Sequence, residues 1–134
     1  MSHRFLNPPG LPEARGFSHL ALPASGQIVY LAGQTGLAAD GILEPDLISQ
    51  FGRACHNVAG ALAAAGGRAT DLVSLHIYVT DIEDYRSHLR ELGSVYREVF
   101  GRHYPPMALL GVKELFDPAA QVELVGVGVI SDQS

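Results

Sequence analysis

The sequence predicts an α+β fold, because the spacing of its apolar side chains changes twice along the chain. In residues 45–66 and 81–101, apolar side chains recur every three or four positions, which is typical of amphipathic helices. Between these segments, residues 73–79 alternate apolar and polar side chains, which is typical of a half-buried strand. With further strands predicted before and after, the order is β-β-α-β-α-β-β. Two helices would then lie on one face of a mixed sheet.

The chain begins with a segment that is predicted to stay outside the packed fold. Residues 1–15 are punctuated by prolines and a glycine, so we expect an extended N-terminal arm. The first strand is predicted at residues 27–32, where β-branched and aromatic side chains are bounded by glycines. Asp40 and Gly41 then predict the tight turn of a short hairpin.

Each predicted helix has a signal at its end. Gly66 follows the first helix, and glycine readily adopts the left-handed conformation that closes helices. Asp81 is placed to cap the second helix at its N-terminus, and Gly101 closes that helix. The last two strands are predicted at residues 107–112 and 121–130, joined by a loop.

The last predicted strand has apolar side chains on both of its faces. Two helices can cover only one face of a sheet, so the other face would leave an apolar patch in water. We therefore expect a second subunit to cover it, with clefts between neighbouring subunits that suit small molecules. The two faces carry Val122, Leu124 and Ile130 on one side, and Val125, Val127 and Val129 on the other.

The composition favours one domain, residues 1–134, without a nucleic-acid or membrane partner. A chain of 134 residues is long enough for one core. Nine Lys and Arg against fourteen Asp and Glu give a formal net charge of −5, and no basic cluster is interleaved with aromatics. No signal-peptide pattern occurs at the start and no apolar run reaches about 18 residues, so a cytoplasmic location is expected.

Glu123 is the ionisable residue that most suggests chemistry, because it interrupts the apolar strand Val122-Glu123-Leu124-Val125. A carboxylate buried there without a partner would lose its hydration, which disfavours the charged form and suits a general acid or base. The alternative is that Glu123 lies near the start of the strand and reaches water. The residues alone leave both interpretations open.

Other candidate residues lie in weaker patterns. His19 lies where the arm meets the first strand, and it could face a cleft or be structural. Ser18 lacks the G-x-S-x-G setting of an esterase. The turn at Gly33 and Gln34 lacks a nucleotide-binding glycine pattern, although it could line a cleft. Cys55 is expected to be a small buried hydrophobe, and no spacing of His, Cys or acidic residues predicts a metal site.

Several short motifs follow one another along the chain. They are Gly16-Phe17-Ser18-His19, Leu31-Ala32-Gly33-Gln34-Thr35-Gly36, Gln50 with Asn57, Val79-Thr80-Asp81 with Tyr85, Pro105-Pro106-Met107, and Val122-Glu123-Leu124. In this order and spacing they resemble the Rid (reactive intermediate deaminase) family, also known as the YjgF or UK114 family. The resemblance covers nearly the whole chain.

The resemblance implies a chorismate-mutase-like fold, a barrel-like homotrimer and ligand clefts between subunits. It also implies cofactor-free hydrolysis of 2-imino or enamine acids, in which an arginine holds the substrate carboxylate and a glutamate positions the attacking water. By motif, the glutamate corresponds to Glu123 and the cleft aromatic to Phe17. The backbone turn corresponds to Gly33 and Gln34, and the arginine to Met107.

The methionine at position 107 leaves two functions open. Met107 cannot make the charge-assisted contact, whose loss typically costs about 10²-fold or more, and Leu109 makes the pocket mouth more apolar. One hypothesis is an imine or enamine deaminase for less acidic or more apolar substrates, with Glu123 as base and His19 as a second proton handler. The other is a protein that binds a small metabolite without turnover. The acidic charge balance argues against a nuclease.

Overall fold

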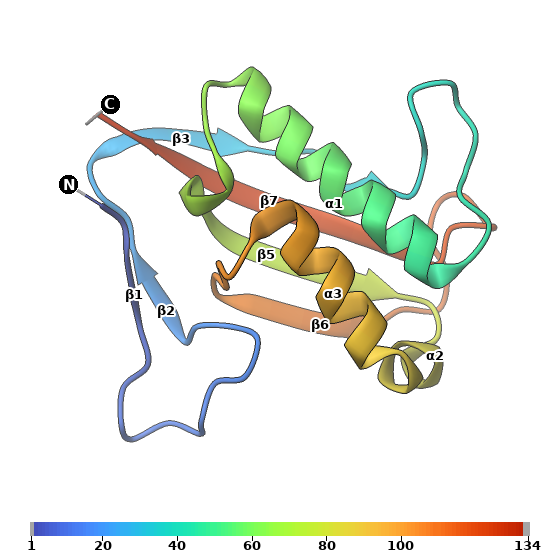
Figure 1. Ribbon diagram of the computed structural model, residues 1–134, viewed down its shortest axis with the longest axis horizontal. Helices are drawn as coiled ribbons and strands as arrows, with labels where there is room; N and C mark the ends of the chain where they lie inside the picture. The colour runs from blue at the N-terminus through green and yellow to red at the C-terminus, as the bar shows by residue number, and fades with distance from the viewer. Residues whose placement is uncertain (1, 133–134) are drawn as a thin grey trace.

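The computed structural model describes residues 2–132 and contains a mixed sheet with helices on one face (Figure 1). The sheet order is β3-β7-β5-β6, and the short β4 also pairs with β7. β7 is antiparallel to β3, β4 and β5, whereas β5 and β6 are parallel. The predicted α+β class and mixed sheet are therefore confirmed. The strands are β3 Gly26–Tyr30, β4 Gln34–Thr35, β5 Leu72–Val79, β6 Met107–Gly111 and β7 Val122–Ser131.

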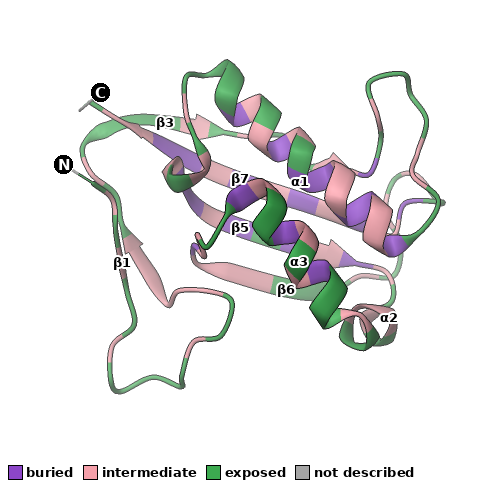
Figure 2. Ribbon diagram, viewed as in Figure 1, coloured by how far each residue is buried: buried purple, intermediate pink, exposed green. Residues whose placement is uncertain are grey.

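Two helices pack on this sheet and bury one of its faces. α1 spans Leu47–Ala64 and α3 spans Leu89–Phe100, and both lie in front of the sheet in Figure 1. Figure 2 shows buried residues along the two helices and along β5 and β7. None of the helices within residues 2–132 is long and apolar enough to cross a membrane. The core that the helices share with the sheet includes Phe51, Val58, Leu62, Leu75, Leu92 and Leu124.

The second predicted helix, residues 81–101, is two helices in the structure. α2 spans Ile82–Ser87, and α3 follows it after His88. Asp81 caps α2 as predicted, accepting a hydrogen bond from the Asp84 N–H at 3.0 Å. His88 has a φ of −126°, outside the helical range, and its Nδ1 lies 2.8 Å from the Asp84 carbonyl oxygen. The apolar spacing continues across this break, so spacing could not reveal it.

The N-terminal arm is packed, contrary to the prediction that it lies outside the fold. β1 (Arg4–Leu6) pairs antiparallel with β2 (Leu20–Leu22). His3 anchors this pair: its Nε2 lies 2.7 Å from the Val129 carbonyl oxygen, and its Nδ1 accepts from the Ala24 N–H at 3.0 Å. Both ring nitrogens are thus satisfied, as burial requires. One histidine in a proline-rich segment gives no pattern from which this anchor could be predicted.

The turn predicted at Asp40 and Gly41 is confirmed. The Gly41 N–H donates to the Ala38 carbonyl oxygen at 2.9 Å, and the φ of Gly41 is 85°, a conformation that favours glycine. Leu37 and Leu43 form an isolated antiparallel bridge across this turn. The hairpin is therefore very short, and it leads from β4 into α1.

Gln50 and Asn57, which belong to one of the motifs, hold loops against α1. Gln50 is 1% exposed; its Nε2 donates to the carbonyl oxygens of Glu44 at 2.9 Å and Ala119 at 3.3 Å. Its Oε1 accepts from the Gln121 N–H at 2.8 Å. Asn57 donates to two carbonyl groups of the segment that precedes α1. These two side chains therefore have structural partners.

The face of the sheet that turns away from the helices is uncovered in the single chain. Ile28 is 55% exposed and Tyr30 is 78% exposed on this face. Val127 is the register partner of Tyr30, and Val125 is the partner of His76, so β7 and β5 contribute to the same surface. This is the face on which the sequence predicts a second subunit.

Candidate functional site

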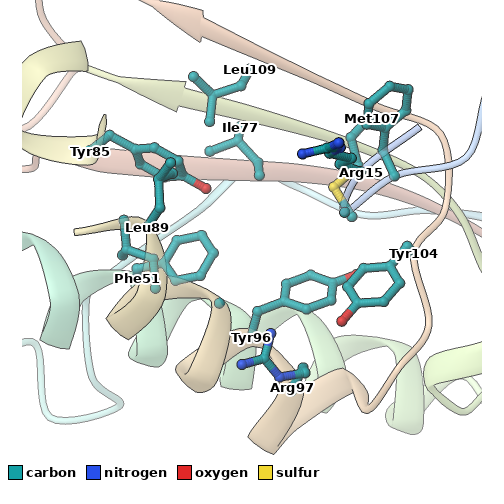
Figure 3. Close-up of a pocket in the computed structure, with 14 residues that line it drawn as sticks. Arg15, Phe51, Ile77, Tyr85, Leu89, Tyr96, Arg97, Tyr104, Met107 and Leu109 are labelled. Atoms are coloured by element: carbon teal, nitrogen blue, oxygen red, sulfur yellow. The ribbon is translucent and has the colours of Figure 1, made fainter. Parts of the chain in front are cut away.

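A cavity of about 590 Å³ lies on the helix-covered side of the sheet (Figure 3). Its walls come from the arm, α1, α2, α3, β5 and β6, and they consist largely of aromatic and aliphatic side chains. Arg15 and Arg97 are the two charged residues among them. The volume falls within the range of about 300–1,000 Å³ that is typical of small-molecule sites.

The cavity brings together three of the residues that the sequence selected. Phe17, Met107 and Leu109 all line it. On β6, Met107 and Leu109 are the register partners of Leu75 and Ile77, which are buried under the helices. Both β6 side chains therefore belong to the helix-covered face.

Ser18 and His19 position the arm beside this cavity. The Ser18 hydroxyl donates to the Tyr104 carbonyl oxygen at 2.6 Å, and the Ser18 N–H donates to the Pro105 carbonyl oxygen at 3.3 Å. His19 Nε2 lies 2.6 Å from the Pro12 carbonyl oxygen. The His19 ring also contacts Phe17 edge to face, with centroids 5.2 Å apart. The two side chains thus have partners on the arm and at the start of β6.

Three tyrosines in the cavity wall were not among the candidate site residues, although Tyr85 belongs to one of the motifs. Burial raises the pKa of Tyr85 to about 12 and also raises the pKa of Tyr96, so both phenols are neutral at physiological pH. The Tyr96 hydroxyl donates to the His103 carbonyl oxygen at 2.6 Å, and its ring stacks on Tyr104 at 5.6 Å. In Figure 3 the Tyr85 hydroxyl points into the cavity. The helical spacing of Tyr85 and Tyr96 indicated only core positions, and Tyr104 lies in the loop before β6, where no pattern marked it.

Glu123 lies on the other face of the sheet. Its register partners are Tyr78 on β5 and Thr35 on β4, whereas its neighbour Leu124 is buried under the helices. The half-buried Glu123 carboxylate lies against the backbone of Gly33, and a Cβ at position 33 would overlap it. Within residues 2–132, the Glu123 side chain has no hydrogen bond or ion pair. One chain therefore keeps Glu123 apart from the cavity.

Gln34 lies in β4, and Gly36 lets the segment that follows β4 pack closely on α1. Gln34 is the register partner of Leu124, and its Nε2 donates to the Ala32 carbonyl oxygen at 3.5 Å. A Cβ on Gly36 would lie 2.5 Å from the Cα of Gln50, so only glycine allows this close approach. The glycine at position 36 is therefore explained by close packing within the chain.

Neither a metal centre nor a reactive thiol adds to the candidate site. Across residues 2–132, no three His, Cys, Asp or Glu side chains come together in a way that could hold a metal ion. Cys55 is buried in α1, and burial raises the pKa of its thiol. A nucleophilic role for Cys55 is therefore disfavoured.

A family model and a solved structure match this fold over almost its whole length. The model described as Endoribonuclease L-PSP matches residues 11–130. The chain belongs to this family. A conserved Rid-family protein of unknown function from Yersinia pestis, YyfB, has a TM-score of 0.86 at 26% identity, covering 97% of this chain and 100% of that one. The Rid resemblance of the motifs is thus confirmed.

Two further relatives differ in how much of the chain they match. The RutC family protein YjgH of Escherichia coli (strain K12) is 33% identical over 89 residues, which is 66% of this chain and 66% of the relative. The 2-iminobutanoate/2-iminopropanoate deaminase of Dermatophagoides farinae is 26% identical over 129 residues, which is 95% of this chain and 96% of that protein. The similarity to the mite deaminase therefore extends over nearly the full length of both chains.

Proposed function

We propose that this Rid-family protein hydrolyses the C=N bonds of small imines, including imines formed from enamines by tautomerisation, in a cleft that two copies of the chain complete. The observation that carries the proposal is the carboxylate of Glu123. It is half-buried, lies on the uncovered face of the sheet, and has no hydrogen-bond or ion-pair partner within residues 2–132. A carboxylate in this state can accept a proton from water that is held against a substrate.

The proposed site combines this carboxylate with the cavity of a neighbouring subunit. The cavity supplies a largely apolar enclosure for a small molecule, but its walls contain no Asp, Glu or His side chain. Glu123 supplies the missing base, and the uncovered sheet face on which it lies is the expected contact surface between copies. The proposal includes a cytoplasmic homotrimer in which residues 1–134 act as one domain.

The proposed reaction adds one water molecule across the C=N bond. Glu123 takes a proton from water as the oxygen bonds to the imine carbon and passes this proton to the nitrogen, giving a carbinolamine. The carboxylate then takes the hydroxyl proton of the carbinolamine and delivers it to the nitrogen, so that the C–N bond breaks and ammonia leaves as the carbonyl forms. Imine and water become carbonyl compound and ammonia, so no oxidant, reductant or cofactor is required.

Met107 and Leu109 favour a substrate with a larger apolar body than 2-iminobutanoate. Both side chains line the cavity, and neither can bind a charge or donate a hydrogen bond. A leucine-derived imine would bury more apolar surface against these walls than the four-carbon imine does, and each buried methylene contributes about 0.8 kcal/mol.

The direct test is imine hydrolysis with variants of the proposed base. Imines are generated in the assay mixture, from threonine by a threonine dehydratase and from leucine by an amino-acid oxidase. The decay of each imine is then followed. The native chain should accelerate decay of the leucine-derived imine more than decay of the threonine-derived imine. Glu123→Gln should lower the rate of hydrolysis about 10²-fold or more. Glu114→Gln, at an exposed carboxylate outside the cavity, serves as the control. Equal rates for native chain and Glu123→Gln would refute the proposal.

A second candidate function is binding of a small molecule without turnover. The absence of Asp, Glu and His side chains from the cavity lining favours it. In that case the native chain would leave imine decay at the buffer rate, yet would bind a ligand with an affinity that Glu123→Gln does not change. Although the matching family model is named for RNA cleavage, a net charge of −5 does not favour binding to a phosphate backbone.

A further inference from the structure

The Tyr85 hydroxyl is a polar group of the cavity that has no partner in the chain. It makes no hydrogen bond within residues 2–132, and Figure 3 shows it pointing into the cavity. The Tyr96 hydroxyl, by contrast, donates to the His103 carbonyl oxygen at 2.6 Å. A hydroxyl group that is taken out of bulk water without a hydrogen bond is destabilising, so a ligand that pairs with Tyr85 would remove this cost.

The side chains that surround this hydroxyl are apolar. Figure 3 shows Tyr85 on the side of the cavity that carries Leu89 and Phe51, with Ile77 facing it. The Phe51 and Tyr85 rings meet edge to face, with centroids 6.2 Å apart, and this contact limits how the Tyr85 ring can turn. Phe51 and Ile77 are themselves buried. The hydroxyl is therefore held in one direction among groups that cannot pair with it.

The chemistry of this hydroxyl favours a neutral acceptor. Burial, with a smaller contribution from Cys55, raises the pKa of Tyr85 to about 12, so the phenol stays protonated at physiological pH and can donate. An anion placed among these apolar side chains would lose its hydration, and neither of the two guanidinium groups of the lining lies beside Tyr85 in Figure 3. A carbonyl or ether oxygen accepts a hydrogen bond at a much smaller desolvation cost.

We propose that Tyr85 is a specificity determinant that selects ligands whose apolar body carries a neutral hydrogen-bond acceptor, a carbonyl or ether oxygen to which its hydroxyl donates. The proposal rests on the proposed function, in that it takes this cavity to be the ligand site. It adds a residue of α2 that recognises the body of the ligand and takes no part in the proton transfers assigned to Glu123.

The test compares two unreactive probes of the same shape, acetophenone and isopropenylbenzene, in which a methylene group replaces the carbonyl oxygen. Their affinities for the native chain and for Tyr85→Phe are measured by NMR titration, which needs no turnover. Tyr85→Phe should bind acetophenone about tenfold more weakly and isopropenylbenzene equally well. The second result would show that the cavity persists in the variant. An equal change in both affinities, or no binding of acetophenone to the native chain at millimolar concentration, would overturn the proposal.

Two other tyrosines sharpen the assignment to Tyr85. Tyr30→Phe is the matched control, because it removes the same group from an exposed residue of β3 outside the cavity, and it should change neither affinity. Tyr104 also lines the cavity, and its hydroxyl makes no hydrogen bond within the described residues. Figure 3 shows Tyr104 on the side opposite Tyr85. A loss of acetophenone affinity in Tyr104→Phe but not in Tyr85→Phe would overturn the proposal.

The results separate this inference from the proposed hydrolysis. Binding of acetophenone that depends on the Tyr85 hydroxyl, without any imine hydrolysis, would keep the specificity determinant and remove the catalytic proposal. Imine hydrolysis that depends on Glu123, with the same probe affinities in Tyr85→Phe as in the native chain, would do the reverse.

Discussion

Met107 and Glu123 lie on opposite faces of the same sheet. Met107, on β6, lines the cavity beneath the helices, whereas Glu123, on β7, lies against Gly33 on the uncovered face. No rotation of side chains within one chain can bring a group through a hydrogen-bonded sheet. If both residues serve one reaction, they must come from different subunits.

The uncovered face should therefore mediate self-association. Light scattering should give a mass that is a multiple of the 14.3 kDa chain, with a trimer expected. Val127→Glu, in the middle of the face, should dissociate the oligomer because it would bury an unpaired charge. Ala64→Glu, at an exposed position of α1, is the matched control and should leave the mass unchanged. A stable native monomer would remove the basis for a shared site.

A methyl group at position 33 should move the proposed base without disturbing the fold. The nearest atoms to a Cβ built on Gly33 all belong to the Glu123 side chain, which can rotate away. Gly33→Ala should thus lower the rate of imine hydrolysis about 10²-fold, since small misplacements of catalytic groups are costly. Its melting temperature should stay close to that of the native chain. Gly10→Ala, where a Cβ meets nothing within 4 Å, should change neither quantity.

Replacing Gln50 should destabilise the protein because three backbone groups would lose their partner. Gln50→Leu would leave the carbonyl groups of Glu44 and Ala119 and the N–H of Gln121 without their side-chain contact. Unsatisfied buried groups cost about 1–3 kcal/mol each, so chemical denaturation should show a loss of roughly 3 kcal/mol. A loss no larger than that of Gln27→Leu, at an exposed position of β3, would contradict this role.

His88 should stabilise the junction of α2 and α3 more when it is protonated than when it is neutral. The hydrogen bond to the Asp84 backbone, with further help from the charges of Asp84 and Glu91, raises the pKa of His88 above its ordinary value of 6.5. A raised folded-state pKa gives stability that is full below the unfolded pKa and disappears as pH rises through the folded one. The melting-temperature advantage of native over His88→Gln should therefore shrink from about pH 5 to about pH 9. An advantage that grows with pH would show the opposite linkage.

Periodicity predicted those parts of the fold in which burial follows the local pattern. The two-residue alternation in β5 and the apolar stripe of α1 correspond to elements that the structure confirms. At the break, the His88 ring contacts Asp84, and the arm is held by the two ring nitrogens of His3. Such single contacts produce no repeating signal, so sequence patterns could not indicate them.

The sequence identified some residues of the candidate site and missed others, for a related reason. Phe17, Met107 and Leu109 were selected through motifs, and they do meet at the cavity. Tyr85 and Arg97 lie on helices, where their spacing marks only a core position and a solvated one. They line the same cavity as residues of the arm and of β6, and this meeting depends on the three-dimensional arrangement of the elements, which a one-dimensional pattern does not contain.

Subunit mixing tests the shared site most directly. Met107→Trp, which fills the cavity, and Glu123→Gln are each expected to be inactive in imine hydrolysis. Co-expressed in equal amounts, they should form mixed oligomers in which about a quarter of the sites pair an intact cavity with an intact Glu123. We predict recovery of activity to about that fraction of the native rate. Mixed oligomers that form but stay as inactive as either parent would contradict a site shared between subunits.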